Sequence, residues 1–584
     1  MDAPKSNADR LDRAAETGSR LSNTRRFAPL RTDVGTLLLH WGTAIAFVIS
    51  LFTGLRIAAD GYGVAFSKWL SPILPTGEIW TWHFFAGLSL FFFVSAYFIY
   101  VNRTGLLARN ALKKLRILLI PSAGRRKLEA LNVSLHWASF ALVLVMTVTG
   151  VLLYIGFGGW LVWIHSTSAF IGLAYIFVHV ISHYLQGGWQ QIFRIFRPAK
   201  LVVTNAVRPY PLLFAALAGA TTVAIAAGVD WATRDTLTIT RADSAPMLDG
   251  VLDDAVWSKA RPISIRTQQG VNLAGTGESN VEVRAIHHAG NSYFAFTWED
   301  PTRSLRRIPM IKKADGWHLL HERADLAEVN TFYEDKFAAG FTRSSEYGSG
   351  ESTYLGAQPL PDKPASLHGR GYHYTQSADN LMDLWQWKAS RGGLLGYVDD
   401  QYFGVPREPT PSEAAGKSRY QAGYWNDPGR AFYSYNYVGE PPGGYQGPVK
   451  VHRLPRDWQK TLEALGKFDL DPNSNDQEGA RWWMEESESV PYSADLDAAI
   501  PVGTVMPGVL ISGTYEGDRA DVRGAAKWKD GHWHLEVMRK LQTGSQFDQD
   551  FVPGRDLYMW VNVFDHTQTR HSRHARPVRV VTQP

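Results

Sequence analysis

The stretch ALNVSLHWASFALVLVMTVTGVLLYIGFGGWLVWIHSTSAFIGLAYIFVHVISHYLQGGWQQIF (residues 130–193) decides the fold, because it contains no Asp, Glu, Lys or Arg. A helix needs about 20 mostly apolar residues to cross the hydrocarbon core of a bilayer. The stretch is long enough for two crossings, separated by a glycine-containing turn at 155–160. We therefore predict two membrane-spanning helices, over about 130–154 and 161–184.

Three further apolar segments predict additional spans, over about 34–57, 80–101 and 210–229. Basic residues cluster before the first span, between the second and third, and between the fourth and fifth, whereas the other two connections hold few charges. Because cytoplasmic loops are enriched in Lys and Arg, the N-terminus is predicted to be cytoplasmic and the chain after the fifth span periplasmic. The N-terminus is polar and does not resemble a cleaved signal peptide, so we expect the first span to act as the export signal.

Composition narrows the chemistry. The chain has 584 residues and a net charge of +5, but residues 1–230 carry 21 basic and 9 acidic residues, whereas the rest carries a net charge of −7. It has no cysteine, 18 histidines and 21 tryptophans. The absence of cysteine excludes disulfides, iron–sulfur clusters, thiolate zinc sites, a cysteine nucleophile and covalently attached c-type haem. Histidine is therefore the main soft ligand that the chain can offer to a metal.

The chain changes character at Trp231. Stretches of alternating hydrophobicity, such as 235–241, 281–286, 293–298 and 557–563, are typical of strands. Gly- and Pro-rich segments at 345–380 and 404–450 lie between them. We therefore predict a five-helix α-helical membrane bundle followed by an all-β sandwich with large loops.

Six histidines fall in the membrane part, where an ionisable side chain is costly and usually functional. By their places in the spans, His40 and His136 lie near the cytoplasmic face, and His83 and His165 near the periplasmic face. His179 follows His165 by 14 residues, which returns it to the cytoplasmic level about 21 Å along the same helix face. The sixth, His183, lies at the end of a span and is expected to be interfacial.

This spacing suits two stacked haems that share one helix. Neutral imidazoles can ligate haem iron from both sides. We predict one pair of ligands from His83 and His165. The second pair joins His179 to His40, with His136 as the alternative partner. The competing interpretation is that these histidines only form hydrogen bonds between helices.

An internal repeat supports the haem interpretation. HWGTAIAFVISLFTG (residues 40–54) and HWASFALVLVMTVTG (residues 136–150) share their first and last two residues at an offset of 96. Residues 30–200 here resemble the bacterial cytochrome b561 superfamily, which includes the b-type subunits of nickel–iron hydrogenases and formate dehydrogenases. The resemblance implies that His40, His83, His165 and His179 ligate two haems b and that the bundle exchanges electrons with the quinone pool.

A second resemblance covers about residues 235–580. It is carried by the order of five short motifs: LDGVLDDAVWSKA (248–260), KKADGWH (312–318), YEDKFAAGF (333–341), DLWQWKA (383–389) and DGHWHLEVMRKLQTG (530–544). Together they resemble the haem-binding domain of the ethylbenzene dehydrogenase gamma subunit and its dimethyl-sulfide dehydrogenase relatives. That resemblance implies a β-sandwich that holds one haem b between a methionine and a lysine.

The family resemblance suggests which residues of this sequence would ligate the third haem. Lys388 matches the lysine best, and burial beside Trp385 and Trp387 would lower its pKa toward the neutral amine that binds iron. Alternatively, Lys388 is an ordinary lysine lying over aromatic rings. Gly340 stands where some relatives have the methionine. The candidates for the second ligand are Met310, Met382 and His368.

These inferences predict a cytochrome of the bacterial inner membrane. Residues 1–29 form a basic cytoplasmic tail, 30–200 a di-haem bundle, 201–230 a fifth helix and 231–584 a periplasmic haem-binding sandwich. Electrons would pass between membrane quinone and a periplasmic redox protein through two transmembrane haems b and a third haem b. No catalytic residue and no nucleic-acid partner are indicated.

Two other functions are compatible with the sequence. The motif at 248–257 also resembles carbohydrate-binding sandwiches, in which case Trp385 and Trp387 would be exposed to ligand. The chain could also be the membrane anchor subunit of a periplasmic oxidoreductase, which differs from the first hypothesis mainly in its partner.

Overall fold

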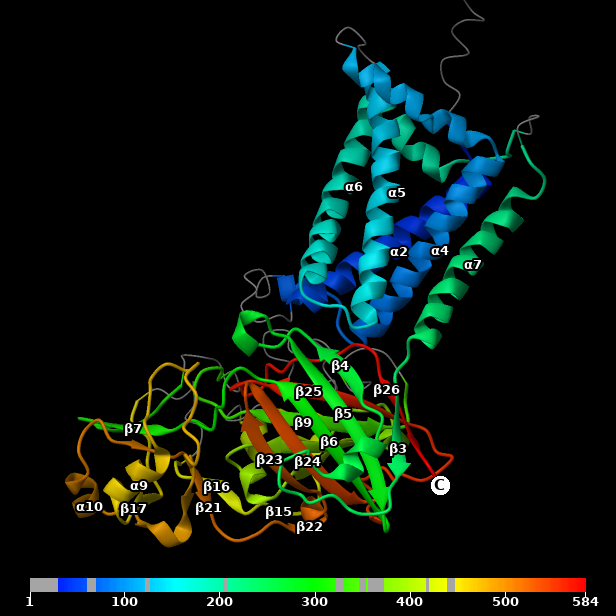
Figure 1. Cartoon of the computed structure of the whole chain (residues 1–584). Helices are drawn as coiled ribbons and strands as arrows, with labels where there is room; N and C mark the ends of the chain where they lie inside the picture. The colour runs from blue at the N-terminus through cyan, green and yellow to red at the C-terminus, as the bar shows by residue number, and fades with distance from the viewer. Residues whose placement is uncertain are drawn as a thin grey trace, which may run out of the picture. The chain divides into compact units, whose positions relative to one another are not determined.

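The computed structural model describes residues 30–59, 70–120, 126–202, 207–321, 329–345, 353–354, 372–415, 420–438 and 447–584. It contains five helices that are long and apolar enough to cross a membrane, which confirms the predicted helical bundle. Figure 1 shows them as α2 (Val34–Ala59), α4 (Ile79–Arg103), α5 (Arg126–Tyr154), α6 (Trp160–Phe193) and α7 (Pro211–Ala232).

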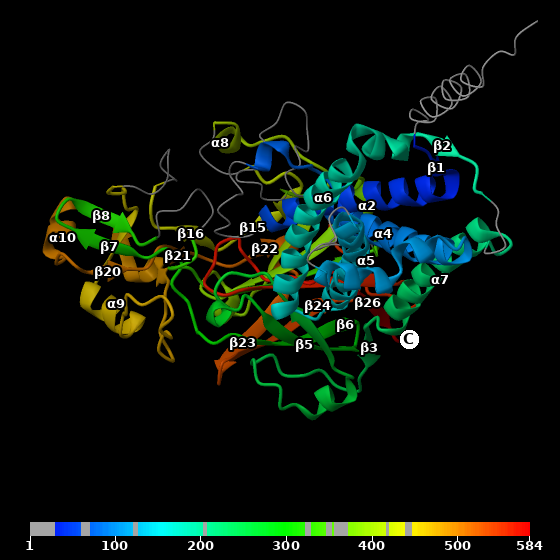
Figure 2. The ribbon, with the colours of Figure 1, turned by 90° about the horizontal axis from the view of Figure 1, so that it is seen from above.

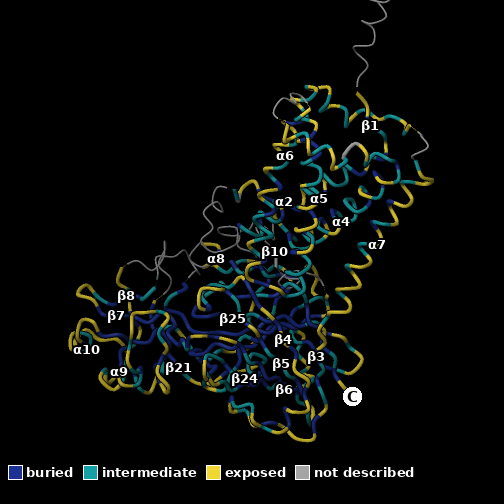
Figure 3. The backbone as a smooth tube through the Cα atoms, turned by 45° about the horizontal axis from the view of Figure 1, so that its top comes forward, coloured by how far each residue is buried: buried dark blue, intermediate teal, exposed yellow. Residues whose placement is uncertain are grey.

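The helices expose some of their large apolar side chains, such as Phe85 and Ile225, and bury others, such as Leu39 and Leu90. Figure 3 shows exposed positions scattered over the bundle helices, as expected for surfaces that face lipid. Gly42 of α2 lies against the Phe93 ring of α4, where a Cβ would approach the ring to 2.4 Å. Gly219 of α7 packs against Phe92 of α4 in the same way, so α7 lies beside α4 at the edge of the bundle (Figures 1 and 2).

The C-terminal domain is built on a 12-stranded sheet with the order β14-β13-β12-β9-β25-β26-β3-β5-β6-β24-β23, with β4 paired to β5. The parallel pairings of β3 with β26 and with β5 join its two halves. Residues of both halves share one core, so the sheet forms the predicted sandwich. Its strands are β3 (Thr236–Arg241), β4 (Ile263–Thr267), β5 (Ser279–His288), β6 (Asn291–Glu299), β9 (Lys336–Thr342), β12 (Met382–Lys388), β13 (Asp399–Phe403), β14 (Tyr424–Asn426), β23 (Arg523–Lys529), β24 (His532–Lys540), β25 (Leu557–Phe564) and β26 (Val578–Thr582).

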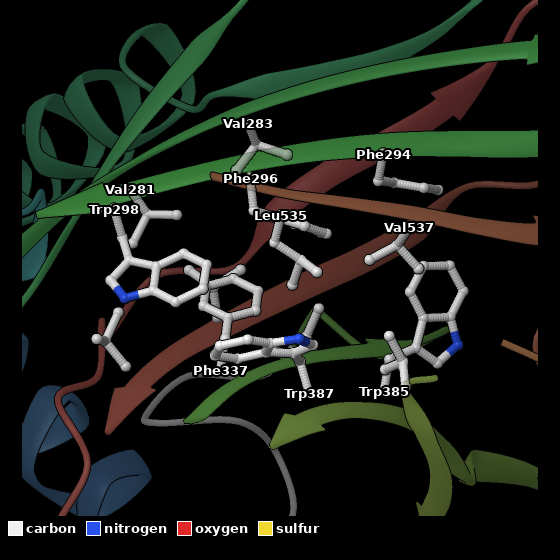
Figure 4. Close-up of a cluster of buried hydrophobic side chains, with 14 of the residues drawn as sticks. Val281, Val283, Phe294, Phe296, Trp298, Phe337, Trp385, Trp387, Leu535 and Val537 are labelled. Atoms are coloured by element: carbon white, nitrogen blue, oxygen red, sulfur yellow. The ribbon is translucent and has the colours of Figure 1, made fainter. Parts of the chain in front are cut away.

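The sandwich core is rich in aromatic rings. Trp298 of β6, Phe337 of β9 and Trp387 of β12 meet there, with ring centroids 4.7 to 5.8 Å apart (Figure 4). Trp385 lies in the same core, and the two tryptophans of β12 are 2% and 0% exposed. Because side chains alternate along a strand, the even-numbered residues of β12, including Lys388, lie on the opposite face.

A smaller core lies beside the sandwich within the same domain. It is formed by β7 (Met310–Lys313), β8 (Gly316–Leu319), β20 (Val505–Met506) and the short helices α9 (Trp458–Leu465) and α10 (Ala494–Ala499). Met310 is fully buried in this core.

Candidate functional site

The first histidine pair lies between α4 and α6. The rings of His83 and His165 have centroids 6.2 Å apart and planes at 80°. With metal–nitrogen bonds of about 2 Å, two imidazoles on opposite sides of one iron hold their centroids about 6 Å apart. The pair therefore has the spacing that axial ligation of a single iron requires.

Hydrogen bonds fix which nitrogen of His83 is available. Its Nδ1 lies 3.0 Å from the Thr53 hydroxyl and 3.1 Å from the carbonyl oxygen of Ser50. A carbonyl only accepts, so Nδ1 carries the proton and Nε2 keeps its lone pair for a metal. In the second repeat, Nδ1 of His165 lies 2.9 Å from the Thr149 hydroxyl.

The internal repeat now has a structural explanation. Thr53 with Gly54, and Thr149 with Gly150, are the last two residues of the two repeats. The threonine binds the imidazole of a neighbouring helix, and the glycine leaves room for it. A Cβ at Gly54 would lie 3.1 Å from Cε1 of His83, and one at Gly150 would lie 3.3 Å from Cε1 of His165. Sequence analysis detected the repeat but not this supporting role.

The second cluster joins histidines from α2, α5 and α6. His136 and His179 have ring centroids 6.0 Å apart, a spacing close to that of the first pair. The Nδ1 of His136 donates to the carbonyl of Asn132 at 3.0 Å, which leaves its Nε2 available. His40 of α2 lies near both His136 and His179. His183 packs edge-on against His179, with centroids 4.6 Å apart.

The two clusters differ in one position of α4. Fourteen residues after His165, α6 carries His179, whereas fourteen residues after His83, α4 carries Tyr97. The two repeats supply His40 and His136, and α6 supplies His179 at the level where α4 carries Tyr97. Besides His183, three histidines are then available to the second site.

In the C-terminal domain, Lys388 does not lie beside Trp385 and Trp387 as its place in the sequence suggested. Strand alternation turns it to the other face, where its Nζ forms an ion pair with Asp399 of β13. Asp399 also pairs with Arg519. The environment of Lys388 is therefore ionic and tyrosine-lined, with the Tyr433 ring 5.9 Å away.

Lys388 belongs to a buried group that we call the basic–tyrosine cluster. Arg307 stacks on Tyr435 at 3.8 Å, and Arg391 pairs with Glu334. Although burial alone would raise it, Arg307 and Arg391 lower the pKa of Tyr435 to about 8. The cluster comprises the cations Arg307, Lys336, Lys388, Arg391 and Arg519, the carboxylates Glu334 and Asp399, and the tyrosines Tyr333, Tyr433, Tyr435, Tyr437 and Tyr515.

Even without Lys336, the four other basic side chains of this cluster outnumber its two carboxylates. Buried charge without a counter-charge is costly, so the cluster is suited to an anionic group. Burial lowers the pKa of Lys336 well below that of an ordinary lysine. Its Nζ donates to the carbonyl of Gln568 at 2.8 Å and lies 4.0 Å from the centre of the Phe564 ring.

The candidate second ligands lie in different places. Met310 packs in the smaller core, which shares Tyr333 and Tyr437 with the basic–tyrosine cluster. Met382 lies six residues from Lys388 on the same face of β12, about 20 Å away by the rise of a strand. That separation is too large for both to bind one iron. His368 lies outside the described residues.

Comparison with known proteins assigns both parts of the chain. Residues 31–198 match the family model of the prokaryotic cytochrome b561, and residues 254–576 match that of ethylbenzene dehydrogenase. The first match defines the class, a membrane b-type cytochrome that transfers electrons and holds haem b in its helical bundle. The second covers more than half of the chain, which belongs to the ethylbenzene dehydrogenase family with a cytochrome b561 domain at its N-terminal side. Both predicted resemblances are confirmed.

Solved structures resemble the chain only weakly. One is a carbohydrate-binding module of family 9 from Caldicellulosiruptor kristjanssonii in complex with glucose, at 8% identity and a TM-score of 0.21, covering 59% of this chain and 95% of that chain. Another is a putative carbohydrate-binding protein from Bacteroides uniformis ATCC 8492, at 8% identity and a TM-score of 0.23, covering 60% and 100%. No curated protein matches the sequence.

Proposed function

We propose that the chain conducts electrons between membrane quinone and a periplasmic redox partner, through two haems b in the bundle and a third in the C-terminal domain. The observation that carries this proposal is the pair of histidine clusters 14 residues apart on α6, each with imidazole centroids about 6 Å apart. When bound, each haem iron accepts and donates one electron. The chain's own residues hold the macrocycles, fix the imidazole tautomers and exclude water.

In the first site, we assign His83 and His165 as the axial ligands. In the second, His179 is common to both arrangements. The family resemblance favours His40 as its partner, whereas the ring spacing of 6.0 Å also fits His136. Alanine variants of His40 and His136 separate these arrangements, because only the variant of the true ligand lowers the haem content of the purified protein from the wild-type level.

The orientation proposal rests on charge. The connection between α4 and α5 contains Lys113, Lys114 and Arg116, and Arg194 and Arg197 follow α6. The turn between α5 and α6 has no charged residue. By the positive-inside rule, the connection between α4 and α5 and the segment after α6 are cytoplasmic, and the C-terminal domain is periplasmic.

The basic–tyrosine cluster supports a third haem, because the two propionates of haem b would offset its excess of buried cations. Lys388 can bind iron only if it leaves its ion pair with Asp399. Lys336 of β9 is the register partner of Lys388 on the neighbouring strand β12. Burial already favours the neutral amine of Lys336. Met310 and His368 remain the candidates for the opposite position.

Haem counting on the full chain tests this proposal. We expect three haems per wild-type chain and two in the alanine variant of whichever lysine is the ligand, Lys388 or Lys336. Two haems in the wild-type protein would contradict the third site without affecting the proposal for the bundle.

The carbohydrate-binding alternative required Trp385 and Trp387 to be exposed. Both are buried in the sandwich core (Figure 4), so neither can stack on a sugar. An anchor subunit for a separate oxidoreductase uses the same haems, and differs only in the protein that receives or supplies the electrons.

A further inference from the structure

Four aspartates meet at one edge of the sandwich, away from the haem candidates. We call Asp383, Asp400, Asp427 and Asp548 the aspartate cluster. Asp383 lies on β12 and Asp400 on the neighbouring β13, both on the core-facing side. Asp427 follows β14 directly, and its backbone N–H donates to the carbonyl of Asp400. Carboxylate oxygens of Asp383, Asp400 and Asp548 all lie within 4.8 Å of one another.

These carboxylates are buried, and most of their oxygens accept no hydrogen bond from the described residues. Both oxygens of Asp427 and Asp548, together with Oδ1 of Asp383 and Oδ2 of Asp400, accept no hydrogen bond from the described residues. Asp383, Asp400 and Asp427 are at most 2% exposed, and the side chain of Asp548 is 1% exposed. Buried polar atoms are normally paired, so the clustered oxygens of Asp383, Asp400 and Asp548 are suited to share a cation.

The protein supplies too little positive charge here. Among the described residues, Arg539 is the cation that contacts the cluster. It donates to Oδ2 of Asp383 and lies 3.6 Å from Oδ2 of Asp548.

A second acidic group provides an internal comparison. Asp335, Asp565 and His566 also lie close together in the sandwich. There, Asp335 accepts hydrogen bonds from the backbone N–H of Ser304 and of His566, and from the indole of Trp533. Asp565 accepts from Thr302 and from the backbone N–H of Leu273. Protein donors therefore bond to the carboxylates of Asp335 and Asp565, in contrast to most oxygens of the aspartate cluster.

We propose that the aspartate cluster binds one calcium ion, with Asp383, Asp400 and Asp548 as carboxylate ligands and Asp427 completing the set. Calcium takes six to eight oxygen ligands at about 2.3–2.6 Å in flexible geometries. Two oxygens bound to one such ion are at most about 5 Å apart, which agrees with the spacing of these carboxylates. Magnesium requires a more regular octahedron, and zinc prefers nitrogen and sulfur ligands.

The ion would join segments that are distant in the sequence. It would tie strands β12 and β13, and the residue after the edge strand β14, to the loop that carries Asp548. Binding therefore stabilises this edge of the folded domain, and the stabilisation grows with the free calcium concentration.

Thermal unfolding of the full-length, detergent-solubilised protein tests the site. After removal of metals with a chelator, calcium should raise the Tm of the wild-type protein in a saturable manner. The same addition should leave the Tm of Asp400→Asn and Asp427→Asn unchanged. Asp243→Asn is the matched control, because its side chain is 90% exposed and distant in sequence from the cluster; it should respond as the wild type does.

Terbium luminescence gives a second measurement that does not depend on the variants folding. Trp385 lies 5.0 Å from the guanidinium of Arg539, which contacts the cluster. Excitation of tryptophan should therefore sensitise a terbium ion bound there, and calcium should displace it at one ion per chain. A Tm that rises on acidification but not with calcium, together with no calcium-displaceable terbium signal, would overturn the proposal and show that the aspartates are simply protonated.

Discussion

At the scale of single residues, two threonines that are not proposed as ligands orient the imidazoles of the first histidine pair. Thr53 and Thr149 lie within 3.0 Å of Nδ1 of His83 and His165. A partner on Nδ1 orients the ring and leaves Nε2 as the ligand. The adjacent glycines provide the space that the rings occupy. Each TG pair therefore supports a histidine of another helix that we propose as a haem ligand.

Replacing Thr149 by valine preserves shape and removes the hydroxyl. We expect the affinity of the first site for haem to fall by about 10- to 100-fold, as for other partners of metal-bound histidines, while the second site keeps its haem. Haem content after dilution and redox titration of each haem would measure the change. Thr221→Val on α7 is the control, since Thr221 only donates to the carbonyl of Leu217; an equal loss there would contradict the assigned role.

At the scale of elements, strand β12 shows how alternation separates two functions. Its odd-numbered tryptophans fill the core, and its even-numbered Lys388 faces the basic–tyrosine cluster. Trp387→Ala should destabilise the domain by about 3–5 kcal/mol, the usual cost of emptying a large aromatic site. Thermal unfolding would measure it as a large drop in Tm. Val502→Ala, at a position 66% exposed, should leave Tm almost unchanged.

Helices and strands could be predicted where a local sequence pattern determines them. The charge-free stretch at 130–193 predicted α5 and α6, and the alternation at 281–286 predicted part of β5. The non-helical backbone at Gly187 and Gly188 interrupts α6 close to the predicted end at 184, and a short second helical segment runs on to Phe193.

Long-range pairing was not predictable. The ion pair of Lys388 with Asp399 depends on the position of β13 beside β12. In the aspartate cluster, Asp548 lies beside Asp383 although 165 residues separate them in the chain. No local sequence pattern predicts this contact. The histidine depths were visible in the sequence, whereas the meeting of His136 with His179 required the helices to be packed.

At the scale of the whole molecule, the absence of cysteine makes the orientation easy to measure. A single cysteine at Phe157, in the turn between α5 and α6, should react with a membrane-impermeant maleimide added outside the inner membrane. A cysteine at Leu119, between α4 and α5, should react only after the membrane is opened. Both side chains are exposed, at 54% and 84%. The reverse pattern would place the C-terminal domain in the cytoplasm.

For the whole molecule, we propose above all that α6 bridges two haems through His165 and His179. The most direct measurement is the haem content and reduced-minus-oxidised spectrum of purified full-length His165→Ala and His179→Ala. We expect each variant to lose one haem of the bundle, with different spectral components lost in the two. Retention of every haem in either variant, or loss of the same component in both, would contradict the pairing.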